Sequence, residues 1–248
     1  MPGDLSFWLE LGAVTLLTSV VSGVMGMAGG MMLLAFMLLR WEPLVAIPVH
    51  GVVQLVANGS RAWFLRRHVA WPPVWRFVWP LLPAGALGVA LLGYVPVSAS
   101  RVGIGLFVLA ATWLKSFFAV EARQATRALP LGGALVGFFS TLLGATGPLL
   151  GPFILALELG SQATIATLAA CQIFQHASKV LLFGLQGFAL GRYALPCLAL
   201  SLCAVAGSAI GTRLLDRIPQ KPFRLTIKLV LSALALQQLY VGVTTMLG

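Results

Sequence analysis

The sequence predicts an all-α polytopic membrane protein made of two inverted repeats, each a Gly-broken re-entrant-type helix hairpin plus three transmembrane helices. Three observations predict this fold: the composition, polar positions that recur at a fixed offset, and the distribution of basic residues. Of the 248 residues, 59% are hydrophobic and only 9% are charged, whereas about 25% are charged in a typical soluble domain. A helix needs about 20 apolar residues to cross the hydrocarbon core. Uncharged runs of about that length or more recur along the chain, over 11–39, 43–60, 77–100, 128–157, 159–178, 193–212 and 229–248.

The two halves of the chain share glycine and polar positions at an offset of 118 residues. Gly26 aligns with Gly144, and Gly29 with Gly147. The aligned polar residues farther along are Gln54, Asn58, Ser60 and Arg61 in the first half, and Gln172, His176, Ser178 and Lys179 in the second. The offset then grows to about 123, where GVALLGYVP (88–96) aligns with GTRLLDRIP (211–219). Because internal duplication is common in transporters, we divide the chain into repeats at 1–125 and 126–248.

The first repeat is predicted to begin with a helix hairpin over 5–40. Its two helices, 5–25 and 29–40, are separated by the stretch GMAGG (26–30). The apolar stretch 31–39 is too short to cross a membrane at about 1.5 Å per residue, and the whole hairpin is about twice the length of one crossing. A hairpin that enters and leaves on the same side fits both lengths. Three full spans are predicted to follow, over 43–65, 74–94 and 101–120.

The second repeat is predicted to follow the same plan. Its hairpin covers 128–159, with helices at 128–143 and 148–159 separated at GATGPLLGP (144–152). Each repeat then contains an odd number of full crossings, so the second repeat is inverted relative to the first. The three spans of the second repeat are predicted over 161–184, 191–214 and 223–246.

Basic residues support the inverted arrangement. In this topology nine of them share one side: Arg66, Arg67, Arg76, Arg123, Arg127, Arg213, Arg217, Lys221 and Arg224. Three lie on the other side: Arg40, Arg101 and Arg192. The positive-inside rule makes the first side cytoplasmic, which places both termini outside. The predicted location is the bacterial cytoplasmic (inner) membrane. Because the basic residues cluster in short loops, the net charge of +10 is a topology signal and does not indicate nucleic-acid binding.

The two glycine breaks are candidate anion-binding loops. Irregular backbone at membrane depth survives only inside protein or along a wet cavity. A break exposes N–H groups at the start of the next half-helix, where the helix dipole favours anions. The candidate residues are Gly26, Gly29 and Gly30 in the first break, and Gly144, Thr146 and Gly147 in the second. The alternative is close helix packing by small residues, which we favour for the isolated Gly137 and Gly207.

Two cations lie within predicted spans, Arg61 and Lys179, and they are candidates for substrate binding. The alternative for each is snorkelling to the membrane surface. One and two turns upstream lie the further candidates Gln54, Asn58, Gln172 and His176. His50 and His176 are candidates for proton coupling, because imidazole titrates near neutral pH. The acidic residues Glu42, Glu121, Glu158 and Asp216 lie at predicted helix ends, which favours an anionic substrate.

No motif indicates catalysis or a bound cofactor. The chain contains no HExxH, GxSxG or P-loop sequence and no paired carboxylates, which are the patterns of common hydrolases and nucleotide-binding enzymes. No metal site is expected, and the sequence predicts a protein that is not an enzyme.

The duplicated pattern resembles the TauE/SafE family of sulfite exporters. The residues that carry the resemblance are SGVMGMAGGMM (22–32) and STLLGATGPLLGPFI (140–154), the polar stretches 54–61 and 172–179, and the basic turns RRHVAWPP (66–73) and TRLLDRIP (212–219). The resemblance covers nearly the whole chain. It implies a carrier for sulfur-containing anions such as sulfite, sulfonates or thiosulfate, with the proton gradient as a candidate driving force.

The leading hypothesis is therefore a secondary transporter of a small anion, working by alternating access at a midplane site between the repeats. A passive anion channel with the same lining is one alternative, and a non-transporting membrane scaffold is another. The expected partners are the small anion and the lipid bilayer. The sequence does not determine the oligomeric state, and a homodimer is one candidate.

Overall fold

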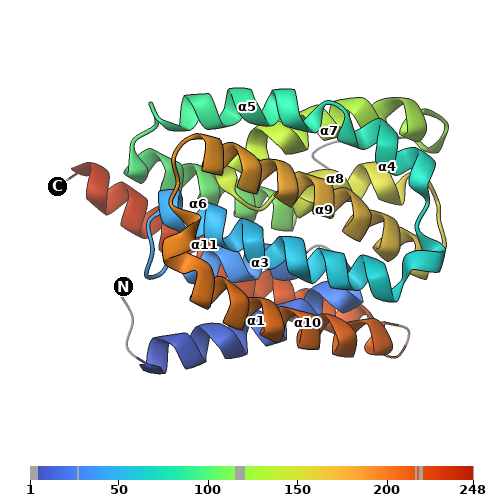
Figure 1. Cartoon of the computed structure of the whole chain (residues 1–248), viewed down its shortest axis with the longest axis horizontal. Coiled ribbons are helices and arrows are strands. Elements are labelled where there is room, and N and C mark those ends of the chain that lie inside the picture. The colour runs from blue at the N-terminus through green and yellow to red at the C-terminus, as the bar shows by residue number, and fades with distance from the viewer. Residues whose placement is uncertain (1–4, 27, 115–120, 216, 218–219, 248) are drawn as a thin grey trace.

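The computed structural model describes residues 5–26, 28–114, 121–215, 217 and 220–247 (Figure 1). It is 86% helical, and the described residues contain no strand, so the predicted all-α class is confirmed. Among the described residues, six helical stretches are long and apolar enough to cross a membrane, and a bent helix pair, Trp71–Val78 with Leu81–Leu92, could add a seventh. The six are Ser6–Met25, Pro43–Phe64, Ala122–Leu143, Ser161–Leu185, Leu190–Leu214 and Ile227–Leu247.

The first half begins with α1, which ends at a break, and continues through a short apolar helix, α2. Glycine at position 26 ends α1 because its φ of 84° lies in the left-handed region that favours glycine. The elements of this half are α1 (Leu5–Met25), α2 (Ala28–Met37), α3 (Pro43–Phe64), η1 (Arg66–His68), α4 (Trp71–Val78), α5 (Leu81–Leu92) and α6 (Val97–Trp113).

Two of the predicted spans in this half differ in their helix bounds from the structure. The single span predicted over 74–94 is the helix pair α4 and α5, bent by 40° at Trp79 and Pro80. Pro80 cannot donate a backbone hydrogen bond, which accounts for the interruption. The helix predicted over 101–120 is α6, which begins at Val97 directly after Pro96 and ends at Trp113. The end of that prediction, 115–120, lies outside the described residues.

The second half repeats the order of a long helix, a break and a short apolar helix. Proline at position 148 lies in the first turn of the short helix, where a missing N–H costs nothing. The short helix α8 ends at Leu155, earlier than predicted. The elements are η2 (Ala122–Gln124), α7 (Ala125–Leu143), α8 (Gly147–Leu155), α9 (Ser161–Leu185), η3 (Leu190–Tyr193), α10 (Ala194–Leu214) and α11 (Gln220–Leu247).

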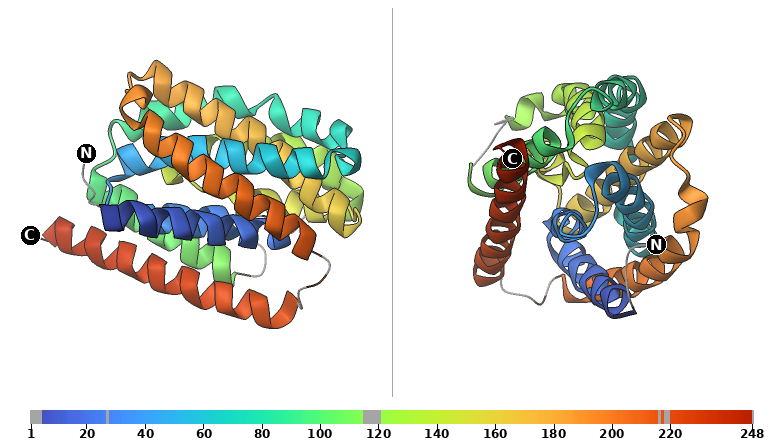
Figure 2. Two further views of the ribbon diagram at one scale, coloured as in Figure 1. Left: turned by 60° about the horizontal axis from the view of Figure 1, so that its bottom comes forward. Right: turned by 90° about the vertical axis from the view of Figure 1, so that its left-hand side faces the viewer.

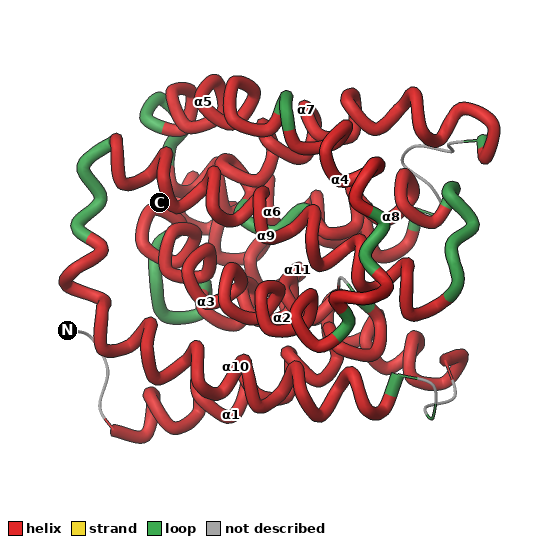
Figure 3. The backbone as a smooth tube through the Cα atoms, turned by 45° about the vertical axis from the view of Figure 1, so that its right-hand side comes forward, coloured by secondary structure: helices red, strands yellow, loops and turns green. Residues whose placement is uncertain are grey.

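Glycines bring two helix pairs into close contact, α1 with α10 and α5 with α7 (Figure 3). A Cβ atom added at Gly211 would lie 2.9 Å from the Cα atom of Gly23, and one at Gly137 would lie 2.5 Å from the carbonyl oxygen of Leu81. One at Gly207 would collide with the carbonyl oxygen of Leu16. The predicted packing role of Gly137 and Gly207 is confirmed, and it fits the use of small residues between membrane helices.

Helices α3 and α9 pack against each other at the centre of the bundle, and α11 packs on α6 at its periphery (Figure 2). Among the six candidate spans, α3 has the largest buried share, 61%, and α11 the smallest, 22%. The start of α1 and the end of α11 lie toward the same end of the bundle (Figure 1). The central pair therefore carries the polar residues where lipid cannot reach them.

Candidate functional site

The two breaks end their helices in the same way. Gly26 and Gly144 adopt φ angles of 84° and 82°. The N–H of Gly26 donates to the carbonyl oxygen of Ser22 at 2.7 Å, and the N–H of Gly144 donates to that of Ser140 at 3.1 Å. Both glycines therefore leave α1 and α7 through the same backbone geometry, and the carbonyl group of each glycine remains free to accept a side-chain donor.

Arg61 and Lys179 supply those donors. Arg61 Nη1 donates to the Gly26 carbonyl oxygen at 3.3 Å, and Lys179 Nζ donates to the Gly144 carbonyl oxygen at 2.7 Å. In both cases the cation lies 35 residues after its glycine. Both side chains have 0% exposure, so neither snorkels to the surface. Carbonyl groups at a helix C-terminus carry partial negative charge, which stabilises a cation at each break.

Each break is covered by apolar side chains from the other half of the chain. A Cβ atom at Gly26 would lie 3.0 Å from Leu168 Cδ1, with Ile165 next to it. A Cβ atom at Gly144 would lie 2.9 Å from Ile47 Cγ1, with a Leu34 methyl group even closer. Ile47 and Ile165 occupy corresponding positions at the offset of 118. The enclosure of the two breaks is thus reciprocal.

A small polar cavity lies between the two breaks and the central helices. Its volume is about 10 Å³, which is room for about one water molecule. The wall combines residues of both breaks with polar side chains of α3 and α9. The lining residues are Ser22, Gly30, Met31, His50, Gln54, Ala145, Thr146, Gly147, Gln172, Gln175 and His176.

A chain of hydrogen bonds connects Arg61 to this cavity. Arg61 Nη1 donates to Asn58 Oδ1 at 3.0 Å. Asn58 Nδ2 in turn donates to the Gln54 carbonyl oxygen at 2.8 Å and lies 3.5 Å from Gln54 Oε1. Because Gln54 lines the cavity, the guanidinium group behind the wall orients an amide that is in the wall.

Lys179 reaches the cavity through His50. His50 Nε2 lies 2.8 Å from the Gly30 carbonyl oxygen, and His50 Nδ1 lies 3.4 Å from Lys179 Nζ. A carbonyl can only accept, so Nε2 carries the proton and Nδ1 accepts from the ammonium group. The ring of His176 lies 5.7 Å from that of His50. Each cation therefore contacts a polar residue of the cavity wall or a residue bonded to one.

The charge balance of the site favours an anion. The four acidic side chains whose exposure the structure describes, Glu10, Glu42, Glu121 and Glu158, are all exposed. Arg61 Nε and Nη2 and His176 Nδ1 are buried without a hydrogen-bond partner among the described residues. Burying a charge without a counterion is costly. An anion in the cavity would compensate the two cations, and the unpaired N–H groups of the Arg61 guanidinium favour the same ligand.

The structure places the predicted residues in two layers. Seven of them line the cavity: Gly30, His50, Gln54, Thr146, Gly147, Gln172 and His176. Six lie behind the wall: Gly26, Gly29, Asn58, Arg61, Gly144 and Lys179. Gly29 has a packing role, because a Cβ atom there would overlap the Thr18 carbonyl oxygen and Ser22 Oγ.

Sequence reasoning missed four lining residues: Ser22, Met31, Ala145 and Gln175. Two of them had a detectable signal. Ser22 aligns with Ser140 at the offset of 118. Gln175 follows Gln172 by three positions, on the same helix face, and its Nε2 donates to Thr146 Oγ1 at 3.0 Å.

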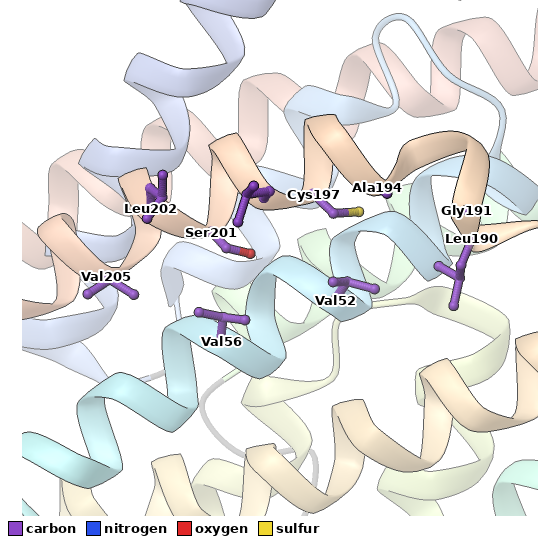
Figure 4. A pocket seen from close by; sticks show the side chains of 10 residues that line it. Val52, Val56, Leu190, Gly191, Ala194, Cys197, Ser201, Leu202 and Val205 are labelled. Carbon is purple, nitrogen blue, oxygen red and sulfur yellow. The ribbon is translucent and has the colours of Figure 1, made fainter.

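A larger cavity of about 590 Å³ lies between α3 and α10 (Figure 4). Val52 and Val56 of α3 face residues of α10 and of the preceding turn. Its lining residues are Val52, Val56, Leu190, Gly191, Ala194, Cys197, Leu198, Ser201, Leu202 and Val205. The lining of this larger cavity is almost entirely apolar. The smaller cavity has a polar lining, and Arg61 and Lys179 are bonded to the breaks behind its wall, so the smaller cavity is the candidate site.

A known protein family matches most of the chain. No curated protein and no solved structure is matched by the chain. Residues 11–237 match the family described as sulfite exporter TauE/SafE, which was the family suggested by the two glycine-rich stretches. Members of this family are transporters, and membership implies a multi-pass membrane protein that handles a sulfite-type anion. Since the match includes both breaks and the central helices, the chain belongs to the sulfite exporter TauE/SafE family.

Proposed function

We propose that the protein is a secondary transporter that binds a sulfur oxyanion or an organosulfonate, such as sulfite, a taurine-like sulfonate or thiosulfate, in its central polar cavity. The observation that carries this proposal is the juxtaposition of both breaks around one buried cavity, with two buried cations directly behind its wall. The acidic residues of the described chain lie elsewhere, on the surface.

The chemistry of the wall suits an anion with several oxygen atoms. The amides of Gln54, Gln172 and Gln175 and the imidazole of His176 can donate hydrogen bonds from α3 and α9. Gly147 opens α8, so N–H groups and the helix dipole at that end favour negative charge. Arg61 and Lys179 attract the anion from behind the wall, since Coulomb attraction is strong at low dielectric.

The transport mechanism we propose is alternating access between two inverted repeats, 1–125 and 126–248. Support comes from the reciprocal geometry: the Arg61–Gly26 and Lys179–Gly144 bonds have equal sequence spacing, and each break is covered by the other half. The cavity of about 10 Å³ holds about one water molecule. An anion therefore needs the helices to move before it can enter, which favours a carrier over a passive channel.

His50 and His176 are the residues we propose for proton coupling. They are buried, their rings lie 5.7 Å apart, and His50 contacts Lys179. Among the described residues, Lys179 contacts His50, and Lys179 and Arg61 are close enough to His176 to act on it electrostatically. A proton lost or gained by this cluster would change the charge available to the anion.

We further propose that the protein lies in the bacterial cytoplasmic (inner) membrane with both termini outside. In this orientation the end of the bundle that carries η1 and the start of α4 is cytoplasmic. That end is rich in arginine, in keeping with the positive-inside rule.

A thermal-stability screen of the purified protein tests the substrate class. Sulfite, thiosulfate and taurine are expected to raise the unfolding midpoint, because a ligand of the folded state at 100 times its Kd adds about 2.7 kcal/mol of stability. Acetate and inorganic phosphate serve as controls for carboxylates and for general anion effects. Stabilisation by acetate alone would reject the sulfur assignment, and stabilisation by none of these anions would reject the site.

A further inference from the structure

The segment between α3 and α5 presents a basic and aromatic surface at one end of the bundle. Pro72 and Pro73 lie in the first turn of α4. Proline favours the start of a helix, because its fixed φ is helical and the first turn needs no N–H donor. The helix buries Val74 and Phe77 and turns its other face outward. We define the basic–aromatic edge as six exposed arginine and tryptophan residues at the end of α3 and in the segment that follows it: Trp63, Arg66, Arg67, Trp71, Trp75 and Arg76.

The arginines of the basic–aromatic edge have no acidic counterion in the described part of the chain. The ion pair that the structure records joins Arg123 to Glu121 instead. Arg66 Nη1 donates to the Trp63 carbonyl oxygen at 3.1 Å, and its guanidinium group lies 4.7 Å from the Trp63 ring centroid. Trp71 and Trp75 stack with their centroids 5.8 Å apart. Positive charge thus lies beside tryptophan rings, the residues that favour the headgroup level of a bilayer.

This edge contacts the helix that carries half of the candidate site. The N–H of Ala70 donates to Thr167 Oγ1 of α9 at 3.0 Å, and the Trp75 ring lies 5.4 Å from that of Phe174, also in α9. Val69 packs against a buried cluster that includes Ile165. Ile165 and Leu168, which cover Gly26, flank Thr167 in α9. Gln172 and Gln175 of the cavity wall follow about one and two turns farther along the same helix.

We propose that the basic–aromatic edge binds the headgroup of an anionic phospholipid of the bilayer, and that the bound lipid favours the position of α9 that supports transport. The arginine forks match phosphate oxygens bidentately, and the tryptophans hold the segment at the interface. Through the contacts of Ala70 and Trp75 with α9, binding of the headgroup then stabilises one position of that helix. The binding part stands on this surface alone, whereas the effect on transport rests on the proposed function.

Two measurements separate these parts. The first is retention of phosphatidylglycerol over phosphatidylcholine by the purified protein in native mass spectrometry. The second is sulfite efflux from vesicles of phosphatidylcholine alone and from vesicles that also contain phosphatidylglycerol. The wild type is compared with R66Q/R67Q/R76Q and with the control R40Q/R192Q, which removes exposed charges elsewhere on the chain. R66K/R67K/R76K keeps the topology signal while removing the guanidinium forks.

We expect the wild type and R40Q/R192Q to retain phosphatidylglycerol preferentially. The glutamine variant should bind it roughly fivefold more weakly for each arginine removed, and the lysine variant should fall in between. In the wild type, sulfite efflux should be faster from vesicles that contain phosphatidylglycerol, whereas in the glutamine variant the lipid should not change the rate. In vesicles of phosphatidylcholine alone, the two proteins should transport sulfite at equal rates. Inorganic phosphate should not replace the lipid.

An unchanged lipid preference in the glutamine variant, or an equal loss in R40Q/R192Q, would overturn the proposal. Lipid binding that is intact while the wild type moves no sulfite would instead reject the proposed function and leave the lipid site standing. Lipid binding without any change in efflux would reject the coupling through α9.

Discussion

Replacing Lys179 with methionine is expected to lower sulfite transport by about ten- to hundredfold, the equivalent of the 1.5–3 kcal/mol of a hydrogen bond to a charged group. The substitution removes the donor to the Gly144 carbonyl oxygen and a positive charge behind the cavity wall. Stability without anion should change little, because the cost of the unpaired carbonyl is offset by relief from burying an ammonium group. The measurements are sulfite efflux from proteoliposomes and the unfolding midpoint with and without sulfite.

The matched control for this substitution is Lys228→Met. Lys228 lies in α11, and its Nζ is 4.9 Å from the Trp113 ring centroid, away from the cavity residues. We expect this variant to transport sulfite at the wild-type rate and to keep the stabilisation by sulfite. If Lys179→Met keeps full transport and the full response to sulfite, Lys179 has no part in anion binding.

Replacing Gly144 with alanine is expected to abolish transport and to destabilise the protein by more than backbone strain alone. A side chain at a φ of 82° costs about 1–3 kcal/mol. The new methyl group would also lie 2.6 Å from Leu34 Cδ2 and 2.9 Å from Ile47 Cγ1, so the break would have to shift against the other half. The carbonyl bonded to Lys179 and the neighbouring wall residues would shift with it.

Gly187 provides a control with the same backbone strain. Its φ is 86°, and a Cβ atom there would meet nothing within 4 Å. Gly187→Ala should therefore lose comparable stability from strain and keep its transport rate. The unfolding midpoints and efflux rates of the two variants are compared directly. Equal transport by both variants would show that the shape of the second break is not required.

The sequence was sufficient to locate the breaks and their cations. Gly26 and Gly144, and Arg61 and Lys179, share one offset, and a charge or a helix break is rare enough in a membrane segment for such a coincidence to be informative. The bend at Trp79 and Pro80 was missed because proline is tolerated in membrane helices, and hydropathy alone does not distinguish a continuous helix from a bent pair.

The layers of the site could not be predicted from the sequence. Arg61 and Lys179 were predicted as candidates for substrate binding, and in the structure they lie behind the cavity wall, bonded to the break carbonyls. Their reach depends on side-chain rotamers and on how far α3 and α9 lie from the breaks, which residue spacing does not determine. By contrast, Gln175 could have been recognised from its helical phase with Gln172.

Entrance counterflow of radiolabelled sulfite tests the central claim most directly, because it requires both binding at one site and alternating access. Proteoliposomes preloaded with unlabelled sulfite should accumulate the label transiently, and empty vesicles should not. The double variant Q54L/Q172L, which removes an amide from each half of the cavity wall, should lose this accumulation. Equal uptake by loaded and empty vesicles would indicate a passive channel, and undiminished counterflow in the double variant would place the transport site elsewhere.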